Sequence, residues 1–281
     1  MEETVKVFIS CDMEGVAGVV DWSQCRPGDR AYDVGCALML AEVNAAIEGA
    51  VTAGADEVVV NDSHGGMFNL DPASLLPPAS YLSGRHKPGY MMEGLDETFD
   101  AIFFVGYHGS ISGPPSVLSH TYNPEVISGV RLQGRPVGES GINALRALAC
   151  GVPIALITGD SVTLEEADWF SGGAVGVQTK ESVTRFAAHH LHPEVARERI
   201  RTAAEQAVQS VRAGAFGVPS VETPYRLEVD LQTADMAEVA TWVRGVERSD
   251  ARSVLIEGND AGAIYRSFVA LTYITRQAGG R

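Results

Sequence analysis

The sequence of 281 residues has few cysteines and little positive charge, and each deficit excludes a class of protein. The four cysteines (Cys11, Cys25, Cys36 and Cys150) form no CxxC or other zinc-finger spacing, so we expect reduced, half-buried side chains. Lys and Arg total 21 against 36 Asp and Glu, which gives a net charge of −15. No nucleic-acid partner is expected, because such a partner requires a basic surface.

Long apolar runs and a secretory signal are also missing. No stretch approaches the roughly 20 consecutive apolar residues that cross a bilayer, so no membrane partner is expected. The N-terminus, MEETVKVFIS, has no basic segment followed by an apolar one. This predicts a cytoplasmic location.

What the sequence does contain is an alternation of strand-like and helix-like segments. Apolar runs of strand length occur at 5–11, 57–61, 101–106 and 153–158, and each breaks into glycine and polar residues. Residues 36–53 carry apolar side chains at helical spacing. Short, continuously apolar strands separated by helices predict an α/β fold, with a mostly parallel sheet covered by helices.

The remainder of the chain is predicted from turn and capping residues. We expect a hairpin over 126–138, a helix over 139–150 and an amphipathic helix over 193–213. Glycines and prolines just after the last of these helices mark a boundary. We therefore predict an α/β domain over 1–214 that carries the functional site, and a smaller C-terminal α+β unit over 215–281.

Residue types that bind metals or carry protons follow the four predicted strands. Asp12 and Glu14 follow the first strand, His64 the second, His108 the third, and Asp160 the fourth. Parallel strands bring the residues that follow their carboxyl ends to one edge of the sheet, where open α/β sheets bind their ligands. Asp12 and Glu14 are two residues apart, so in an extended segment both carboxylates point the same way. Two such charges repel each other unless a cation lies between them.

Glu139 begins the predicted helix after the hairpin and could join this cluster. Two imidazoles and three carboxylates suit Zn²⁺, and also Mn²⁺ or Co²⁺, better than Mg²⁺ or Ca²⁺. Five ligands exceed what one open catalytic zinc needs, which favours two metals bridged by a carboxylate. Such a pair can polarise a carbonyl and make hydroxide from water near neutral pH.

Other histidines have different expected roles. His120 is a candidate proton carrier or electrophile beside the metal site, and its alternative is an ordinary surface-loop histidine. His189, His190 and His192 precede Pro193, and we expect them at a solvated helix terminus.

Six motifs occur in order along the chain: SCDMEGVAGV, VNDSHGGM, MMEGLD, FVGYHG, SH at 119–120, and RPVGESGINA. In this order they resemble the M55 D-aminopeptidases, the DppA-type dipeptide-transport zinc aminopeptidases. The resemblance extends through the whole chain. The segments 109–116 and 121–125 depart from the family pattern on either side of His120, where we expect them to shape the substrate pocket.

The resemblance implies a binuclear zinc enzyme that releases N-terminal D-amino acids from short peptides. The family's metal ligands fall on Asp12 (bridging), Glu14, His64, His108 and Glu139, and its catalytic histidine falls on His120. On chemical grounds we expect metal-bound hydroxide to attack the scissile carbonyl while His120 assists as an acid/base or oxyanion-stabilising group. The resemblance also implies a homo-oligomer, a ring-like decamer whose active sites face an inner channel.

Two other functions stay open at this point. One is a metal-dependent hydrolase of another small amide, an L-peptide or a phosphoester, for which the chain offers only scattered cations: Lys87, Arg131, Arg135, Lys180 and Arg185. The other is a non-enzymatic ring or binding protein whose metal only holds loops together. It is disfavoured because structural zinc sites are usually closed four-ligand sets rich in cysteine. A Rossmann dehydrogenase is also disfavoured, since no GxGxxG follows the first strand.

Overall fold

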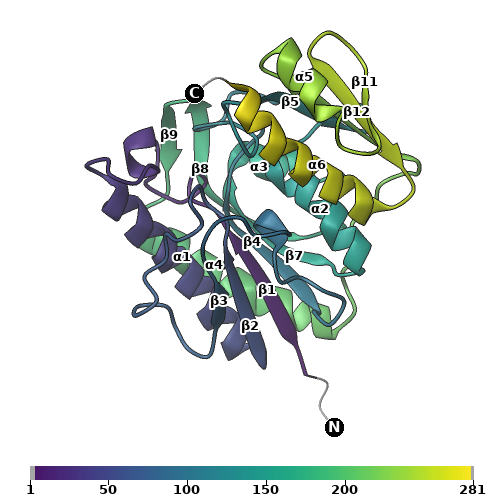
Figure 1. The fold of residues 1–281 in the computed structure, drawn as a ribbon. Coiled ribbons are helices and arrows are strands. Elements are labelled where there is room, and N and C mark those ends of the chain that lie inside the picture. Colours follow the sequence, from purple (N-terminus) through teal and green to yellow (C-terminus); the bar gives the residue numbers. More distant parts are fainter. Residues whose placement is uncertain (1–3, 280–281) are drawn as a thin grey trace.

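The computed structural model describes residues 4–279, and its larger sheet forms the centre of the molecule (Figure 1). This sheet contains seven strands: β1 (Lys6–Cys11), β2 (Glu57–Asp62), β3 (Ser80–Leu82), β4 (Ala101–Tyr107), β7 (Ile154–Asp160), β8 (Val175–Thr184) and β9 (Ala187–His190). They lie in the order β3-β2-β1-β4-β7-β8-β9. All neighbours pair in parallel except β8 and β9, which are antiparallel.

Helices cover both faces of this sheet (Figure 1). On one face lie α1 (Tyr32–Thr52) and α4 (Pro193–Arg212), and on the other α2 (Glu139–Cys150) and α3 (Ser161–Ala167). Successive strand residues therefore enter different cores: Val7 and Ile9 pack with α1 and α4, whereas Phe8 packs on the α2 side. The predicted α/β fold with a mostly parallel, helix-covered sheet is confirmed.

Within the described residues, α1 is long and apolar enough to cross a membrane by length and composition alone. Half of its most apolar stretch is buried inside the protein, where it packs against α4 and the sheet. That burial accounts for its apolar composition, because a core helix must be apolar on the faces that it hides from water.

The smaller sheet lies beyond α2, and all its strands are antiparallel. It contains five strands in the order β11-β12-β10-β5-β6: β11 (Val246–Arg248), β12 (Ser253–Gly258), β10 (Tyr225–Leu231), β5 (Ile127–Leu132) and β6 (Arg135–Pro136). The helices α5 (Ala234–Ala240) and α6 (Ala261–Thr275) pack against this sheet, and α6 also packs against α2 (Figure 1).

The predicted hairpin over 126–138 is present as β5 and β6, but it joins the sheet of the C-terminal segment. Its register places Leu132 opposite Leu227. One continuous apolar core then connects α2, β5, β10 and α6. The unit predicted over 215–281 therefore shares its sheet with strands from the earlier part of the chain. The boundary at residue 214 stays a prediction.

The β8–β9 pair corrects one expectation from the sequence. His189 and His190 lie on β9, opposite Glu181 and Lys180, and not at a helix terminus. Only His192 has the expected role, because its side chain accepts a hydrogen bond from the Glu194 N–H at the start of α4. The alternating, largely polar sequence of β8 carries no continuous apolar run, so the pattern used for the buried strands does not find it.

The order of strands locates the point at which a ligand is expected. From β1 the chain proceeds to β2 and β3 on one side, and later to β4, β7 and β8 on the other. The strand order therefore reverses between β1 and β4. In open α/β sheets the crevice outside the carboxyl ends of the strands at such a reversal binds the ligand.

Candidate metal centre

The loop after β1 is held tightly against the end of β4. Gly15 N–H donates a hydrogen bond to Gly106 O over 2.8 Å. A Cβ at Gly15 would lie 1.7 Å from Tyr107 O, so no side chain fits there. The glycine after Glu14 thus lets the carboxylates of Asp12 and Glu14 reach the crevice beside β4.

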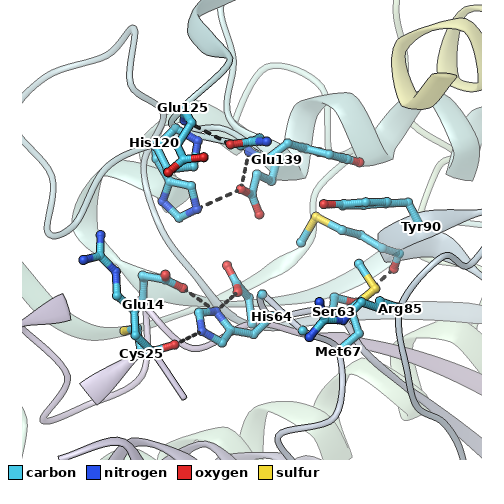
Figure 2. A pocket seen from close by; sticks show the side chains of 18 of the residues that line it. Glu14, Cys25, Ser63, His64, Met67, Arg85, Tyr90, His120, Glu125 and Glu139 are labelled. Atoms are coloured by element: carbon cyan, nitrogen blue, oxygen red, sulfur yellow. Dashed lines mark hydrogen bonds and ion pairs between the residues drawn. The ribbon is translucent and has the colours of Figure 1, made fainter. Parts of the chain in front are cut away.

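All five predicted ligands are buried and meet at this crevice. His64 Nδ1 lies 3.1 Å from Asp12 Oδ1 and 3.0 Å from Glu14 Oε2. His108 Nε2 lies 3.4 Å from Asp12 Oδ2 and 3.9 Å from Glu139 Oε1. Asp12 therefore presents one carboxylate oxygen to His64 and the other to His108, and it lies between the two histidines. Figure 2 shows Glu14 and His64 on one side of the cavity, facing Glu139 and His120 on the other.

Each of the three histidines has one ring nitrogen bound to a backbone carbonyl. The distances are 2.8 Å from His64 Nε2 to Cys25 O, 2.9 Å from His108 Nδ1 to Gly109 O, and 3.0 Å from His120 Nδ1 to Leu118 O. A carbonyl oxygen only accepts, so these nitrogens carry the hydrogen. The other nitrogen of each ring faces the carboxylates. Histidines that bind metals typically show this arrangement, because the carbonyl fixes the ring and its tautomer.

Among the described residues, three buried atoms at the crevice have no hydrogen-bond partner: Asp12 Oδ2, Glu14 Oε2 and His108 Nε2. Leaving one buried polar atom unsatisfied costs about 1–3 kcal/mol. When His108 is neutral with its hydrogen on Nδ1, all three atoms offer a lone pair, so a cation at their common centre would satisfy them together. Their mixed nitrogen and oxygen chemistry fits zinc.

The raised pKa values of three side chains in the cluster, Glu139, His108 and His64, show that the cluster retains protons. Burial and the charge of Asp12 raise the pKa of Glu139 to about 8. Burial lowers the pKa of His108, but Glu139 and Asp12 outweigh it and raise this pKa to about 9. Likewise burial lowers the pKa of His64, and Glu14 and Asp12 raise it well above its ordinary range. Protons thus neutralise the cluster when no cation is bound, as expected where carboxylates share a buried space.

His120 lies beside this cluster with its ring held on two sides. Its ring stacks on His108 with centroids 4.5 Å apart, and Trp22 packs edge-on at 5.6 Å. Its Nε2 lies 3.6 Å from Glu139 Oε1. Burial and the neighbouring His108 lower the pKa of His120 to about 4. Ligand atoms of His108, His120 and Glu139 lie within 4.8 Å of one another, so the geometry allows His120 either to bind a metal or to carry a proton.

Cys25 is a candidate that the sequence did not indicate. Its ligand atom lies within 4.8 Å of those of Glu14 and His64. Burial, with the charge of Glu14, raises the pKa of its thiol. No CxxC spacing marks this residue, and only the folded loop brings it to the cluster. The four cysteines are all free, as predicted, but only Cys36 and Cys150 are half-buried, whereas Cys11 and Cys25 are buried.

Two aspartates at strand ends have structural roles. Asp62 accepts hydrogen bonds from the backbone N–H groups of Asn69 and Leu70, which agrees with the turn role expected from the sequence. Asp160 caps α3 and accepts from the hydroxyls of Ser116 and Ser182. The fourth strand end therefore supports the site without contributing a ligand.

A pocket of about 600 Å³ opens from the cluster of carboxylates and histidines, a volume ordinary for a small-molecule site. Its walls come from segments far apart in the sequence. They include aromatic side chains (Trp22, Tyr90, Tyr122 and Tyr273) and three arginines (Arg26, Arg85 and Arg276). Tyr90 stacks on Tyr122 with ring centroids 5.0 Å apart. A peptide-sized ligand would therefore meet the carboxylates and histidines at the base and aromatic rings along the wall.

Three of the cations that the sequence offered for a phosphate are engaged elsewhere. Lys87 Nζ donates to the Asp62 carbonyl over 2.7 Å. Lys180 Nζ donates to the Glu14 carbonyl over 2.6 Å. Arg131 forms ion pairs on the second sheet. None of these three is free to neutralise a phosphate in the pocket.

Comparisons with known proteins agree with this geometry. Residues 5–270 match the model of the Peptidase M55 family, described as D-aminopeptidase. The chain is 33% identical over 274 residues to a D-aminopeptidase of Bacillus subtilis (strain 168), covering 95% of this chain and 97% of the relative. It also superposes with a TM-score of 0.89 and 29% identity on a solved structure described as "Zn-dependent D-aminopeptidase DppA from Bacillus subtilis, a self-compartmentalizing protease", covering 97% of this chain and 98% of that one. The chain belongs to the M55 family of D-aminopeptidases.

Proposed function

We propose that this chain is a zinc-dependent aminopeptidase that releases N-terminal D-amino acids from short peptides and holds two zinc ions per chain. Its family is one of metal-dependent hydrolases, and its solved relative is described as Zn-dependent. The observation that carries the proposal is the set of buried, unsatisfied acceptor atoms on Asp12, Glu14 and His108. In a chain of this family, such atoms are best explained by metal ions.

Asp12 would bridge the two ions, because its two oxygens face different histidines. Glu14 and His64 would complete one ion's ligands, and His108 and Glu139 the other's. Bound zinc would supply polarisation of the scissile carbonyl and acidification of water. The carbonyl of Cys25 would orient His64 by accepting its second ring N–H.

His120 would act as the proton carrier of the reaction. The Leu118 carbonyl holds the hydrogen on Nδ1, so Nε2 is the nitrogen left to take up a proton. The stacked ring of His108 and the edge of Trp22 fix the direction in which Nε2 points. A proton on Nε2 could pass to the leaving amine, a group that every peptide hydrolysis must protonate.

The relative's description as a self-compartmentalizing protease supports a further part of the proposal. This chain would form a ring-like homo-oligomer, up to a decamer, in the cytoplasm. Sedimentation velocity of the purified protein tests the assembly, and a monomer at micromolar concentration would contradict it.

A panel of small substrates tests the proposed activity. The purified, zinc-loaded protein should release D-alanine from D-Ala-D-Ala and should hydrolyse L-Ala-L-Ala and a phosphodiester far more slowly. Treatment with a chelator should abolish the activity, and added zinc should restore it. Faster turnover of the L-peptide or of the phosphodiester would replace the proposal with the alternative hydrolase.

A further inference from the structure

Three exposed arginines line the pocket above the metal cluster, and they come from distant parts of the chain. Arg26 follows the short helix η1 (Trp22–Gln24), Arg85 lies in the loop after β3, and Arg276 directly follows α6. Figure 2 shows Arg85 at the same side of the pocket as Tyr90. The fold therefore gathers three positive charges around one opening.

Across residues 4–279, none of these three guanidinium groups forms an ion pair or hydrogen bond with an acidic side chain. Arg26 interacts with Asp21 only electrostatically, at longer range. Other arginines do find partners: Arg131 lies 2.8 Å from Asp230, and Arg201 lies 2.6 Å from both Glu198 and Glu205. Arg30, Arg199 and Arg244 also have no such partner among the described residues, so what distinguishes Arg26, Arg85 and Arg276 is that they line one pocket.

Aromatic rings place two of these guanidinium groups. Arg26 lies over the ring of Trp22 at 5.0 Å, and Arg85 lies over the ring of Phe68 at 5.7 Å. An arginine above a ring keeps its N–H donors in the plane of the guanidinium group. Those donors are then available for a planar anion, for which the guanidinium fork is well matched.

The pocket therefore has opposite charges at its two ends. The carboxylates of Asp12, Glu14 and Glu139 are buried at the base, whereas the three arginines are exposed at the mouth, where they outnumber the single exposed carboxylate of the lining, that of Glu125. A short peptide whose scissile bond lies at the base would direct its other end toward the mouth. Every short peptide carries one obligatory anion, its C-terminal carboxylate, whatever its side chains.

We propose that Arg26, Arg85 and Arg276 bind the C-terminal carboxylate of the substrate, so that this chain selects short peptides with a free C-terminus. This inference rests on the proposed function, since it assumes that the ligand is a peptide. Exposed charge pairs of this kind change affinity by up to about fivefold each. Because the groups are exposed, added salt should weaken their effect.

The test compares D-Ala-D-Ala with its C-terminal amide, which differ only in the anion. For the wild-type protein, KM should be about tenfold lower for the free acid. Arg26→Gln, Arg85→Gln, Arg276→Gln and the triple variant should raise KM for the free acid and leave KM for the amide within about twofold. The effect should be largest in the triple variant and should diminish at high salt. Arg199→Gln is the matched control, because Arg199 is exposed on α4 away from the pocket.

Equal KM values for acid and amide in the wild type would overturn the proposal. A triple variant whose KM rises by the same factor for both substrates would also overturn it. Calorimetric binding of the two peptides to zinc-loaded His120→Ala protein separates this proposal from the proposed activity. If neither peptide is hydrolysed by the wild type, the proposed function fails. The arginine site then still stands if the acid binds more tightly than the amide and the triple variant removes the difference, and it falls if they bind equally.

Discussion

Replacing Asp160 with asparagine should destabilise the protein more than a helix-cap substitution normally does. The Asp160 carboxylate is completely buried and accepts three hydrogen bonds. Its Oδ1 accepts from Thr163 N at 2.9 Å, and its Oδ2 accepts from the hydroxyls of Ser116 at 2.5 Å and Ser182 at 2.6 Å. These two serines in turn accept from the backbone N–H groups of Gly109 and Val117, each over 3.0 Å.

The expected loss in the free energy of unfolding follows from the hydrogen bonds of Asp160 that an asparagine amide can replace. Asparagine keeps one acceptor oxygen and gains an NH₂ that only donates. If the oxygen faces Thr163, both serine hydroxyls lose their acceptor. If it faces the serines, the cap of α3 is lost and their bonds are no longer charge-assisted. Since a cap contributes about 1 kcal/mol and a charged hydrogen bond about 1.5–3, either orientation should cost about 2 kcal/mol or more.

Urea unfolding of the two proteins measures this free energy directly, and Asp260→Asn provides a matched control. Asp260 caps α6 through Ala263 N at 2.9 Å but is exposed and receives no serine hydroxyl. Asparagine caps helices as well as aspartate does, so Asp260→Asn should cost only a few tenths of a kcal/mol. Equal losses in the two variants would refute the account of Asp160 as the anchor of the loops that carry His108 and His120.

Three further predictions concern the site and its surroundings. His120→Ala should keep its zinc, measured by mass spectrometry, and lose kcat by roughly a hundredfold or more, whereas loss of zinc would make His120 a ligand. Burial raises the pKa of Glu42 from its ordinary 4.5 to about 7, so between these pH values the folded protein holds a proton that the unfolded chain releases. The stability of the wild-type protein should therefore fall as pH rises through this window. In urea unfolding, Glu42→Gln should gain roughly 3 kcal/mol relative to wild type between about pH 4.5 and 8. Parallel pH profiles of the two proteins would contradict this. Chelation should lower the thermal midpoint, because zinc present at about a thousandfold above its Kd adds about 4 kcal/mol to the folded state, and an unchanged midpoint would count against a metal in this cluster.

The sequence was most informative where local pattern and chemistry coincide. Asp12, Glu14, His64 and His108 follow apolar, buried strands, and parallel pairing brings such strand ends together without knowledge of the strand order. The helix α2 begins at Glu139, where the sequence placed it. The contact of Glu139 with His108 depends on how α2 packs on the sheet, which no local pattern encodes.

Features that depend on distant pairing could not be predicted. The hairpin of β5 and β6 pairs with β10, about a hundred residues later in the chain, and no periodicity within the hairpin identifies that partner. Arg26, Arg85 and Arg276 appear in the sequence as ordinary exposed loop or helix-end residues, and only the fold gathers them. Asp160 ends a strand just as Asp12 does, but two serines turn its carboxylate to a structural role.

On the proposed function, the buried carboxylates and histidines hold two zinc ions that the peptidase activity requires. The most direct measurement is a titration of metal-free protein with zinc, in which D-alanine release from D-Ala-D-Ala is followed against bound zinc per chain. The protein should show no activity without metal and maximal activity when about two ions are bound per chain. Full activity in protein that has been shown to be free of metal would contradict the proposed function.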